Sequence, residues 1–222
     1  MKRIYIVSAI LSVFLLLAGC NAPTGTQVEV IATPAAESTP AEASSEQGQG
    51  LPQTTPTPQG TGESKILVAY FSCTGTTETV ANAAAEVLGA DIYQIQPQEP
   101  YTDADLDYND DGSRAGREQS DAATRPAITG DVEDMAQYDI VFLGYPIWWG
   151  QAPRIVSTFL ESYDFGGKTI VPFCTSGSSG IGSSADDLHS LCADSVAWLP
   201  GTRFGAGTSE EEILDWLSGL DI

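Results

Sequence analysis

The feature that most constrains this chain is an unbroken apolar run from Ile66 to Phe71, followed at once by a polar loop and a helical pattern. A strand that is apolar throughout is buried on both faces, which is typical of parallel sheets covered by helices. Four further short apolar runs alternate with helical patterns, at residues 91–96, 139–145, 168–174 and 196–199. This alternation predicts an α/β domain with a five-stranded parallel sheet.

Helix signals separate these runs. Gly89 closes an alanine-rich helix, Pro153 starts another, and Glu210 to Glu212 lie where the dipole of a final helix favours acidic residues. We expect helices over residues 76–88, 131–138, 153–163, 185–192 and 209–220. With a glycine-containing turn after the first strand, the pattern predicts a doubly wound sheet in the order 2-1-3-4-5.

Residues 1–19 have the pattern of a secretory signal peptide. Lys2 and Arg3 precede an uncharged apolar stretch that is too short for an ordinary membrane-spanning helix. The segment Leu17-Ala18-Gly19-Cys20 resembles the lipobox of bacterial lipoproteins, which implies cleavage before Cys20 and lipidation of its thiol. We therefore expect a lipid anchor at the extracytoplasmic face of a cell membrane. The alternative is a plain signal peptide with an unmodified cysteine.

Residues 20–63 are mostly Thr, Pro, Ala, Ser, Gln and Gly, without apolar periodicity. Such a segment cannot offset the entropy lost on ordering, so we expect a disordered tether. The globular domain is then expected over residues 64–222. The formal net charge of the chain is −21, which excludes nucleic-acid binding because that function depends on Lys and Arg.

The first loop, Ser72-Cys73-Thr74-Gly75-Thr76-Thr77, joins the first expected strand to its helix. Hydroxyls and backbone N–H groups converge there at a positive helix N-terminus, a setting that binds phosphate. The loop lacks the Lys and spacing of a P-loop, and also the Gly-x-Gly-x-x-Gly of dinucleotide folds. A mononucleotide phosphate fits best, and an ordinary Ser/Thr helix cap is the alternative.

Two more loops follow the third and fourth expected strands, at the crevice where doubly wound sheets bind ligands. The second loop, residues 146–150, contains two adjacent Trp that are costly to expose, which favours contact with a flat heteroaromatic ligand. Its alternative is self-packing against the next helix. The third loop, residues 175–182, is rich in Ser and Gly, and its donors would face the same crevice. A flexible surface loop is the alternative there.

Together the three loops resemble the flavodoxin family, in particular a branch with Tyr-Pro-Ile-Trp-Trp at its second loop, and the resemblance covers nearly the whole domain. It implies non-covalent binding of FMN, with the phosphate held by Ser72, Thr74, Gly75, Thr76 and Thr77. The isoalloxazine would lie beside Pro146, Ile147, Trp148, Trp149 and Gly150. Its pyrimidine edge would contact Thr175, Ser176, Gly177 and Gly180. This chain departs from the family in having Thr76-Thr77 where Asn-Thr is usual, and in lacking an aromatic residue in the third loop.

A long crossover, residues 97–138, joins the second and third expected strands. Residues 107–118 satisfy the spacing of an EF-hand calcium loop, but no amphipathic helix precedes them and the normally apolar eighth position is Arg114. We therefore expect no metal site. The crossover resembles the insertion of this flavodoxin branch, which implies a lid beside the flavin, with three candidate partners for a substrate: Tyr101, Arg114 and Arg117.

The remaining reactive side chains have structural interpretations. Cys174 and Cys192 form a disulfide or remain thiols, and the sequence leaves both alternatives open. Cys73 is interpreted as a packed, inert thiol, although a helix N-terminus can also activate a cysteine. His189 is expected on an exposed helix face. No catalytic residue is assigned, because a bound flavin would carry the chemistry.

The hypothesis from sequence is an FMN-binding electron-transfer lipoprotein whose partners are redox proteins or small electron acceptors. Its acidic surface, with no cation expected near the ring, disfavours negative charge on the flavin and so predicts a strongly reducing carrier. The same charge would steer it to a basic partner. One alternative is an FMN-dependent NAD(P)H:quinone-type reductase of small acceptors. Another is a flavodoxin fold that has lost flavin and serves as a receptor or adhesin.

Overall fold

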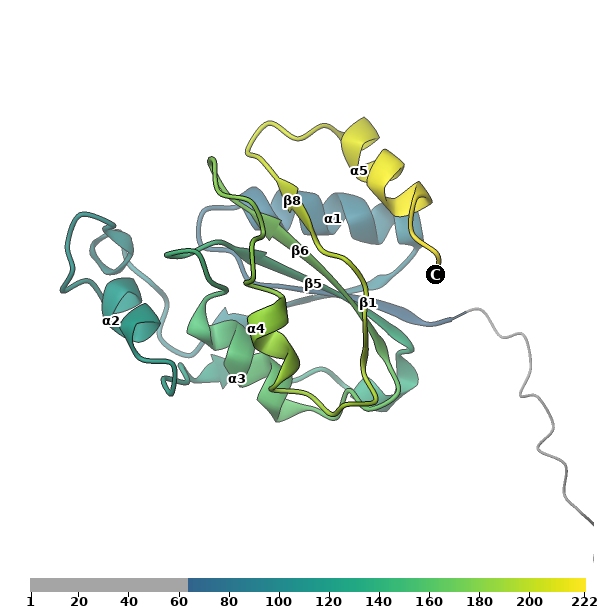
Figure 1. The fold of residues 1–222 in the computed structure, drawn as a ribbon, viewed down its shortest axis with the longest axis horizontal. Coiled ribbons are helices and arrows are strands. Elements are labelled where there is room, and N and C mark those ends of the chain that lie inside the picture. The colour runs from purple at the N-terminus through teal and green to yellow at the C-terminus, as the bar shows by residue number, and fades with distance from the viewer. Residues whose placement is uncertain (1–63) are drawn as a thin grey trace, which may run out of the picture. The chain divides into compact units, whose positions relative to one another are not determined.

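The computed structural model describes residues 64–222 of the chain (Figure 1). The predicted signal peptide (1–19), the predicted lipidation site Cys20 and the predicted tether (20–63) lie outside the described residues. Within the described part, none of the helices combines the length and the apolar character needed to span a bilayer.

The main sheet has the predicted parallel order. Its path is β2-β1-β5-β6-β7, which corresponds to 2-1-3-4-5 when only the main strands are counted. The strands along this path are β1 (Ile66–Tyr70), β2 (Asp91–Gln94), β5 (Ile140–Pro146), β6 (Thr169–Thr175) and β7 (Ala197–Trp198). The register aligns Tyr70 with Gly144 and Gly144 with Phe173, so that the three central strands end at the same edge of the sheet.

The fifth predicted strand is divided in two. β7 pairs with the start of β6, and a further strand that the sequence analysis did not predict, β8 (Thr202–Phe204), pairs with the end of β6. The gap between the two pairings includes Pro172 of β6, which has no N–H to donate. The segment that connects β7 to β8 contains Pro200, which has no N–H either. The edge of the sheet therefore continues through β8 toward the end that carries the three loops.

Helices cover both faces of the sheet, as Figure 1 shows. One face carries α1 (Thr76–Leu88) and α5 (Glu210–Ser218), and the other carries α3 (Arg154–Ser162) and α4 (Asp186–His189). Residues of β1 alternate between the two cores, with Leu67 and Ala69 in one and Val68 and Tyr70 in the other. This burial on both faces explains the unbroken apolar run.

The helix ends follow local sequence signals. α1 ends at Gly89, whose φ of 59° is left-handed and whose N–H bonds back to the helix. α5 begins with a capping box in which Ser209 and Glu212 cap each other's backbone N–H groups. The predicted helix over 131–138 is reduced to a single 3₁₀ turn, Met135–Gln137.

The crossover has its own secondary structure. Two short strands, β3 (Gln96–Pro97) and β4 (Ile128–Thr129), pair antiparallel and close its base. Between them lie a 3₁₀ turn, Ala104–Leu106, and the helix α2 (Arg114–Ser120). Ser113 caps α2 by accepting a hydrogen bond from the N–H of Gly116. The sequence analysis did not predict α2, because seven residues with an internal glycine show no apolar periodicity.

Candidate functional site

The first loop places an open helix N-terminus at the end of β1. Gly75, the N-cap of α1, has a φ of 84°, and no side chain of the described residues caps this end of the helix. The hydroxyl of Ser72 accepts a hydrogen bond from the N–H of Gly75 at 3.1 Å and thereby holds the loop closed. The unpaired N–H groups of the first helical turn leave a partial positive charge that suits a phosphate.

A pocket of about 240 Å³ opens in front of this helix end. One wall comes from the first loop and α1, through Thr74, Gly75, Thr76, Thr79 and Val80. The other wall is the segment between β8 and α5, through Gly205, Ala206 and Thr208. The sequence analysis missed this second wall, because β8 was not predicted and nothing in the sequence brings the segment beside the first loop.

Thr77 joins the first loop to the third. Its hydroxyl lies 2.7 Å from the hydroxyl of Thr175, and both residues are buried. Residues 98 positions apart are thus held together at the edge of the sheet. Thr77 was predicted as a phosphate ligand, and the structure gives its hydroxyl a protein partner as well.

The second loop forms a two-residue turn, which we call the Trp148–Gln151 turn. Trp148 and Gln151 exchange two backbone hydrogen bonds, of 2.9 and 3.0 Å. Trp149 and Gly150 between them have φ values of 47° and 78°, as in the primed turns that close hairpins. A left-handed conformation costs a residue such as Trp roughly 1–2 kcal/mol, so contacts around this turn must maintain it.

The two adjacent Trp have different environments. Trp148 is only 5% exposed, and its ring packs edge-on against Phe71 and Tyr101, with centroids 5.5 and 5.3 Å away. Trp149 is 41% exposed. Trp148 is therefore packed within the protein, although its aromatic partners come from the end of β1 and from the crossover and not from the next helix. The Trp149 ring keeps an exposed surface that a ligand can cover.

An aromatic residue of the crossover stacks on Trp149. The ring of Tyr108 lies nearly parallel to it, with centroids 4.3 Å apart. The Tyr108 hydroxyl also donates a hydrogen bond to the backbone oxygen of Ile147 at 3.2 Å. The sequence analysis did not identify Tyr108, because nothing in the sequence places this residue beside the second loop, 41 positions further along the chain.

The third loop is held from the edge of the sheet. The guanidinium of Arg203 in β8 donates to the hydroxyl of Ser176 at 3.1 Å and to its backbone oxygen at 2.5 Å. The Ser176 hydroxyl in turn donates to the backbone oxygen of Ser179. The expectation that no cation lies near the predicted ring contacts is therefore wrong at Ser176, because β8 brings Arg203 there.

Gln119 of α2 contacts the Trp148–Gln151 turn, and the sequence analysis did not identify it. Its side chain is buried and bonds to backbone atoms of Trp148, Ala152 and Arg154. No sequence signal marks such a residue, since its partners lie about 30 positions away along the chain.

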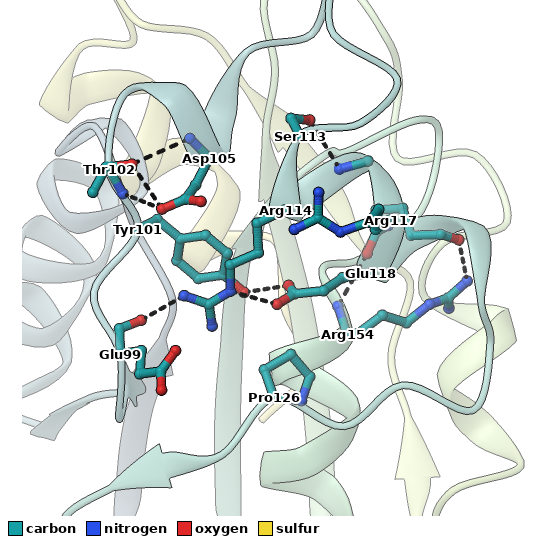
Figure 2. A network of polar contacts seen from close by, with 12 residues as sticks. Glu99, Tyr101, Thr102, Asp105, Ser113, Arg114, Arg117, Glu118, Pro126 and Arg154 are labelled. Carbon is teal, nitrogen blue, oxygen red and sulfur yellow. Dashed lines mark hydrogen bonds and ion pairs between the residues drawn. The ribbon is translucent and has the colours of Figure 1, made fainter.

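The three predicted substrate partners in the crossover are engaged within the protein (Figure 2). Tyr101 donates to one carboxylate oxygen of Glu118 at 2.5 Å, and Arg114 donates to the other at 2.7 Å. Arg114 also lies over the Tyr101 ring and donates to the backbone oxygen of Glu99 at 2.8 Å. Arg117 donates to the backbone oxygen of Gly112. Burial and then the bond to Glu118 raise the pKa of Tyr101, so its hydroxyl stays protonated.

The same contacts engage residues of the segment 107–118, which has the spacing of a calcium loop. Glu118 would supply the last ligand of such a loop, but both of its oxygens are bonded to Tyr101 and Arg114. The side chains of Asp107 and Asp110 accept hydrogen bonds from backbone N–H groups two residues further on. Among residues 64–222, no three His, Cys, Asp or Glu side chains form a cluster suited to a metal ion.

The cysteines of the described part are all free thiols. Cys73 is exposed as a residue, but burial around its sulfur raises the pKa of the thiol to about 12, which agrees with an inert cysteine. Cys174 and Cys192 are not bonded to each other, and burial raises their thiol pKa values to about 12 and about 11. His189 stacks on Trp198, with ring centroids 4.4 Å apart.

Comparisons with known proteins agree with this architecture. The family model described as Flavodoxin matches residues 65–220. A protein from Bacteroides eggerthii named as a flavoprotein is 47% identical, with a TM-score of 0.67 over 72% of this chain and 99% of its own. A protein from Bacteroides uniformis, also named as a flavoprotein, is 44% identical, with a TM-score of 0.67 over 70% of this chain and 98% of its own.

A flavoprotein from Lactobacillus acidophilus, solved in complex with FMN, is 21% identical and has a TM-score of 0.53, over 69% of this chain and 99% of its own. At that identity the likeness concerns the fold alone. The family match covers nearly the whole described part of the chain, from β1 to the end of α5. This chain belongs to the flavodoxin family.

Proposed function

We propose that residues 64–222 bind FMN and pass electrons to a redox partner from the outer face of a bacterial membrane. The observation that carries the proposal is the open N-terminus of α1, aligned at one edge of the sheet with the two loops after β5 and β6. Membership of the flavodoxin family and the FMN complex of the Lactobacillus protein support the choice of cofactor.

The residues at this edge suit FMN. The first loop offers hydroxyls and free N–H groups for a phosphate without a cation, and its pocket is bounded by the segment before α5. Trp149 offers an exposed aromatic surface for a flat ring, and Thr175 and Ser176 begin the loop assigned to the pyrimidine edge. When bound, FMN would supply the one- or two-electron chemistry, and the protein would bind and orient it.

Electron transfer to a protein partner fits the crossover better than turnover of a small substrate. The cations expected to bind a substrate, Arg114 and Arg117, are bonded to Glu118 and to backbone oxygens. An acidic chain with a formal net charge of −21 favours docking to a basic protein surface. The lipid anchor at Cys20 would then hold the domain near membrane-bound partners.

Calorimetry with FMN and riboflavin tests the cofactor assignment. We expect FMN to bind more tightly, because only FMN carries the phosphate for the first loop. Thr74→Ala should weaken FMN binding by about 10- to 150-fold, the effect of losing one charge-assisted hydrogen bond of about 1.5–3 kcal/mol. Riboflavin is the matched control, since its affinity should be the same for both proteins. Equal affinities of the unchanged protein for FMN and riboflavin would contradict the assignment.

The electron-transfer role needs a separate measurement. The FMN-loaded protein should oxidise NADH or NADPH only slowly in the presence of quinones, and should exchange electrons rapidly with a basic redox protein at low ionic strength. Rapid, saturable NAD(P)H oxidation would instead support the reductase alternative.

A further inference from the structure

Gln119 is a polar residue in an unusually enclosed position. It lies near the end of α2, is only 6% exposed, and extends its amide toward the second loop. The amide nitrogen donates to the backbone oxygens of Trp148 and Ala152, at 3.1 and 3.2 Å. The amide oxygen accepts from the N–H of Arg154 at 3.1 Å. Because its partners are two carbonyls and one N–H, the orientation of the amide is fixed.

These three bonds enclose the Trp148–Gln151 turn. Gln119 holds the carbonyl at the first residue of the turn, the carbonyl just after it, and the N–H at the start of α3. Arg154 adds to the support by donating to the backbone oxygen of Gln119 and to the side chain of Gln151, at 3.0 and 2.7 Å. The residue that these contacts hold in a left-handed conformation is Trp149.

Further contacts fix the position of α2, the helix that carries Gln119. Glu118, next to Gln119 in α2, is fixed by Tyr101 and Arg114, as Figure 2 shows. Tyr101 in turn packs on Trp148 at 5.3 Å, so the network contacts the turn a second time. The crossover was expected to be a lid with residues available to substrate. These contacts instead make it a fixed support for the second loop.

We propose that Gln119 is a positioning residue, which acts on the bound flavin through the Trp148–Gln151 turn without contacting it. This inference rests on the proposed binding of FMN beside that turn. Removal of the amide would leave the carbonyl of Ala152 and the N–H of Arg154 without their partner, and the carbonyl of Trp148 with only its bond from the N–H of Gln151. The turn would then relax from its positive-φ conformation. The environment of the flavin ring would change with it.

The test compares two variants of the purified full chain. Gln119→Leu removes all three hydrogen bonds, while Gln119→Glu keeps the acceptor for Arg154 and loses the donors to the two carbonyls. Ser113→Ala is the matched control, because it weakens the cap of the same helix but leaves the Gln119 amide in place. Should Gln119→Leu fail to fold, Gln119→Glu carries the test.

Two readouts separate positioning from general stability. Without FMN, hydrogen exchange at the N–H groups of Trp148 and Gln151 should become at least about tenfold faster in the Gln119 variants and not in Ser113→Ala. With FMN, the midpoint potential and the flavin fluorescence should shift in the same variants only. Unchanged exchange at the turn, or equal effects of Ser113→Ala, would overturn the proposal.

The exchange experiment also distinguishes this proposal from the proposed function. If the unchanged protein binds no FMN while exchange at the turn still depends on Gln119, the proposed function and the effect on the flavin fail, although the support of the turn stands. If FMN binds and neither exchange nor potential responds to Gln119, only the positioning role fails.

Discussion

Replacing each of the two adjacent Trp by Ala should have opposite consequences. Trp148 is 5% exposed and packed between Phe71 and Tyr101. Trp148→Ala would leave a cavity, which costs about 3–5 kcal/mol of the free energy of unfolding. Trp149 is 41% exposed and stacks on Tyr108, so Trp149→Ala should lower that free energy much less, by about 0.5–1.5 kcal/mol for the lost stacking. Since Ala is also a residue with a Cβ, the backbone strain at a φ of 47° stays the same.

The effect of Trp149→Ala on FMN binding follows from its exposed surface. Aromatic side chains bury up to about 250 Å² each, so an exposed share of 41% leaves roughly 100 Å² for a ligand to cover. At about 25 cal/mol per Å² this area contributes up to about 2.5 kcal/mol, and stacking adds about 0.5–1.5 kcal/mol. FMN covers only part of this surface, so we expect a loss of about 2–3 kcal/mol, or about 30- to 150-fold in Kd.

Calorimetry gives the FMN affinity, and urea denaturation without FMN gives the stability. Flavin fluorescence should rise in Trp149→Ala, because a stacked Trp quenches the excited ring by donating an electron. Trp148→Ala serves as the control for general damage to the second loop. Unchanged FMN affinity in a folded Trp149→Ala protein would refute the stacking role, whatever happens to Trp148.

Three further predictions concern other parts of the chain. Gly144→Ala should lower the free energy of unfolding by about 1–3 kcal/mol in urea denaturation, because the new Cβ would lie 2.2 Å from the Phe173 ring; unchanged stability contradicts this packing. Cys73, whose thiol pKa is raised to about 12, should react with iodoacetamide at neutral pH far more slowly than in the denatured protein, and equal rates would show an active thiolate. Cys20→Ser should move the protein from the membrane fraction to the soluble fraction, and a variant that stays with the membrane would exclude the lipid anchor.

The strand order could be predicted because its causes are local. Each central strand is buried on both faces, so its apolar character appears directly in the sequence, as at Ile66 to Phe71. Two elements depend on tertiary context instead. β8 pairs along only three residues beside Pro172, and α2 has seven residues whose stability comes from the contacts of Glu118 and Gln119. Neither has a periodicity that a sequence pattern reveals.

The loops of the site could be located from sequence, but not the roles of single residues. Trp148 and Trp149 are chemically identical neighbours, and their positions in the Trp148–Gln151 turn decide which ring is buried. Gln119 and Arg203 contact residues of the second and third loops that lie 29 and 27 positions away along the chain. Such contacts depend on how the crossover and β8 fold back, which no local pattern shows.

The hydroxyl pair of Thr77 and Thr175 has a consequence for how the two ends of the site communicate. Either oxygen can be the donor in this 2.7 Å contact, but only one hydrogen fits between them. Whichever hydroxyl accepts keeps its own hydrogen free to point elsewhere. A ligand atom that accepts from Thr77 therefore forces Thr175 to donate inward, and one that accepts from Thr175 reverses the direction. The direction of this hydrogen bond therefore couples the first loop to the third. The first ligand atom that binds either hydroxyl would determine which of the two threonines donates to the other.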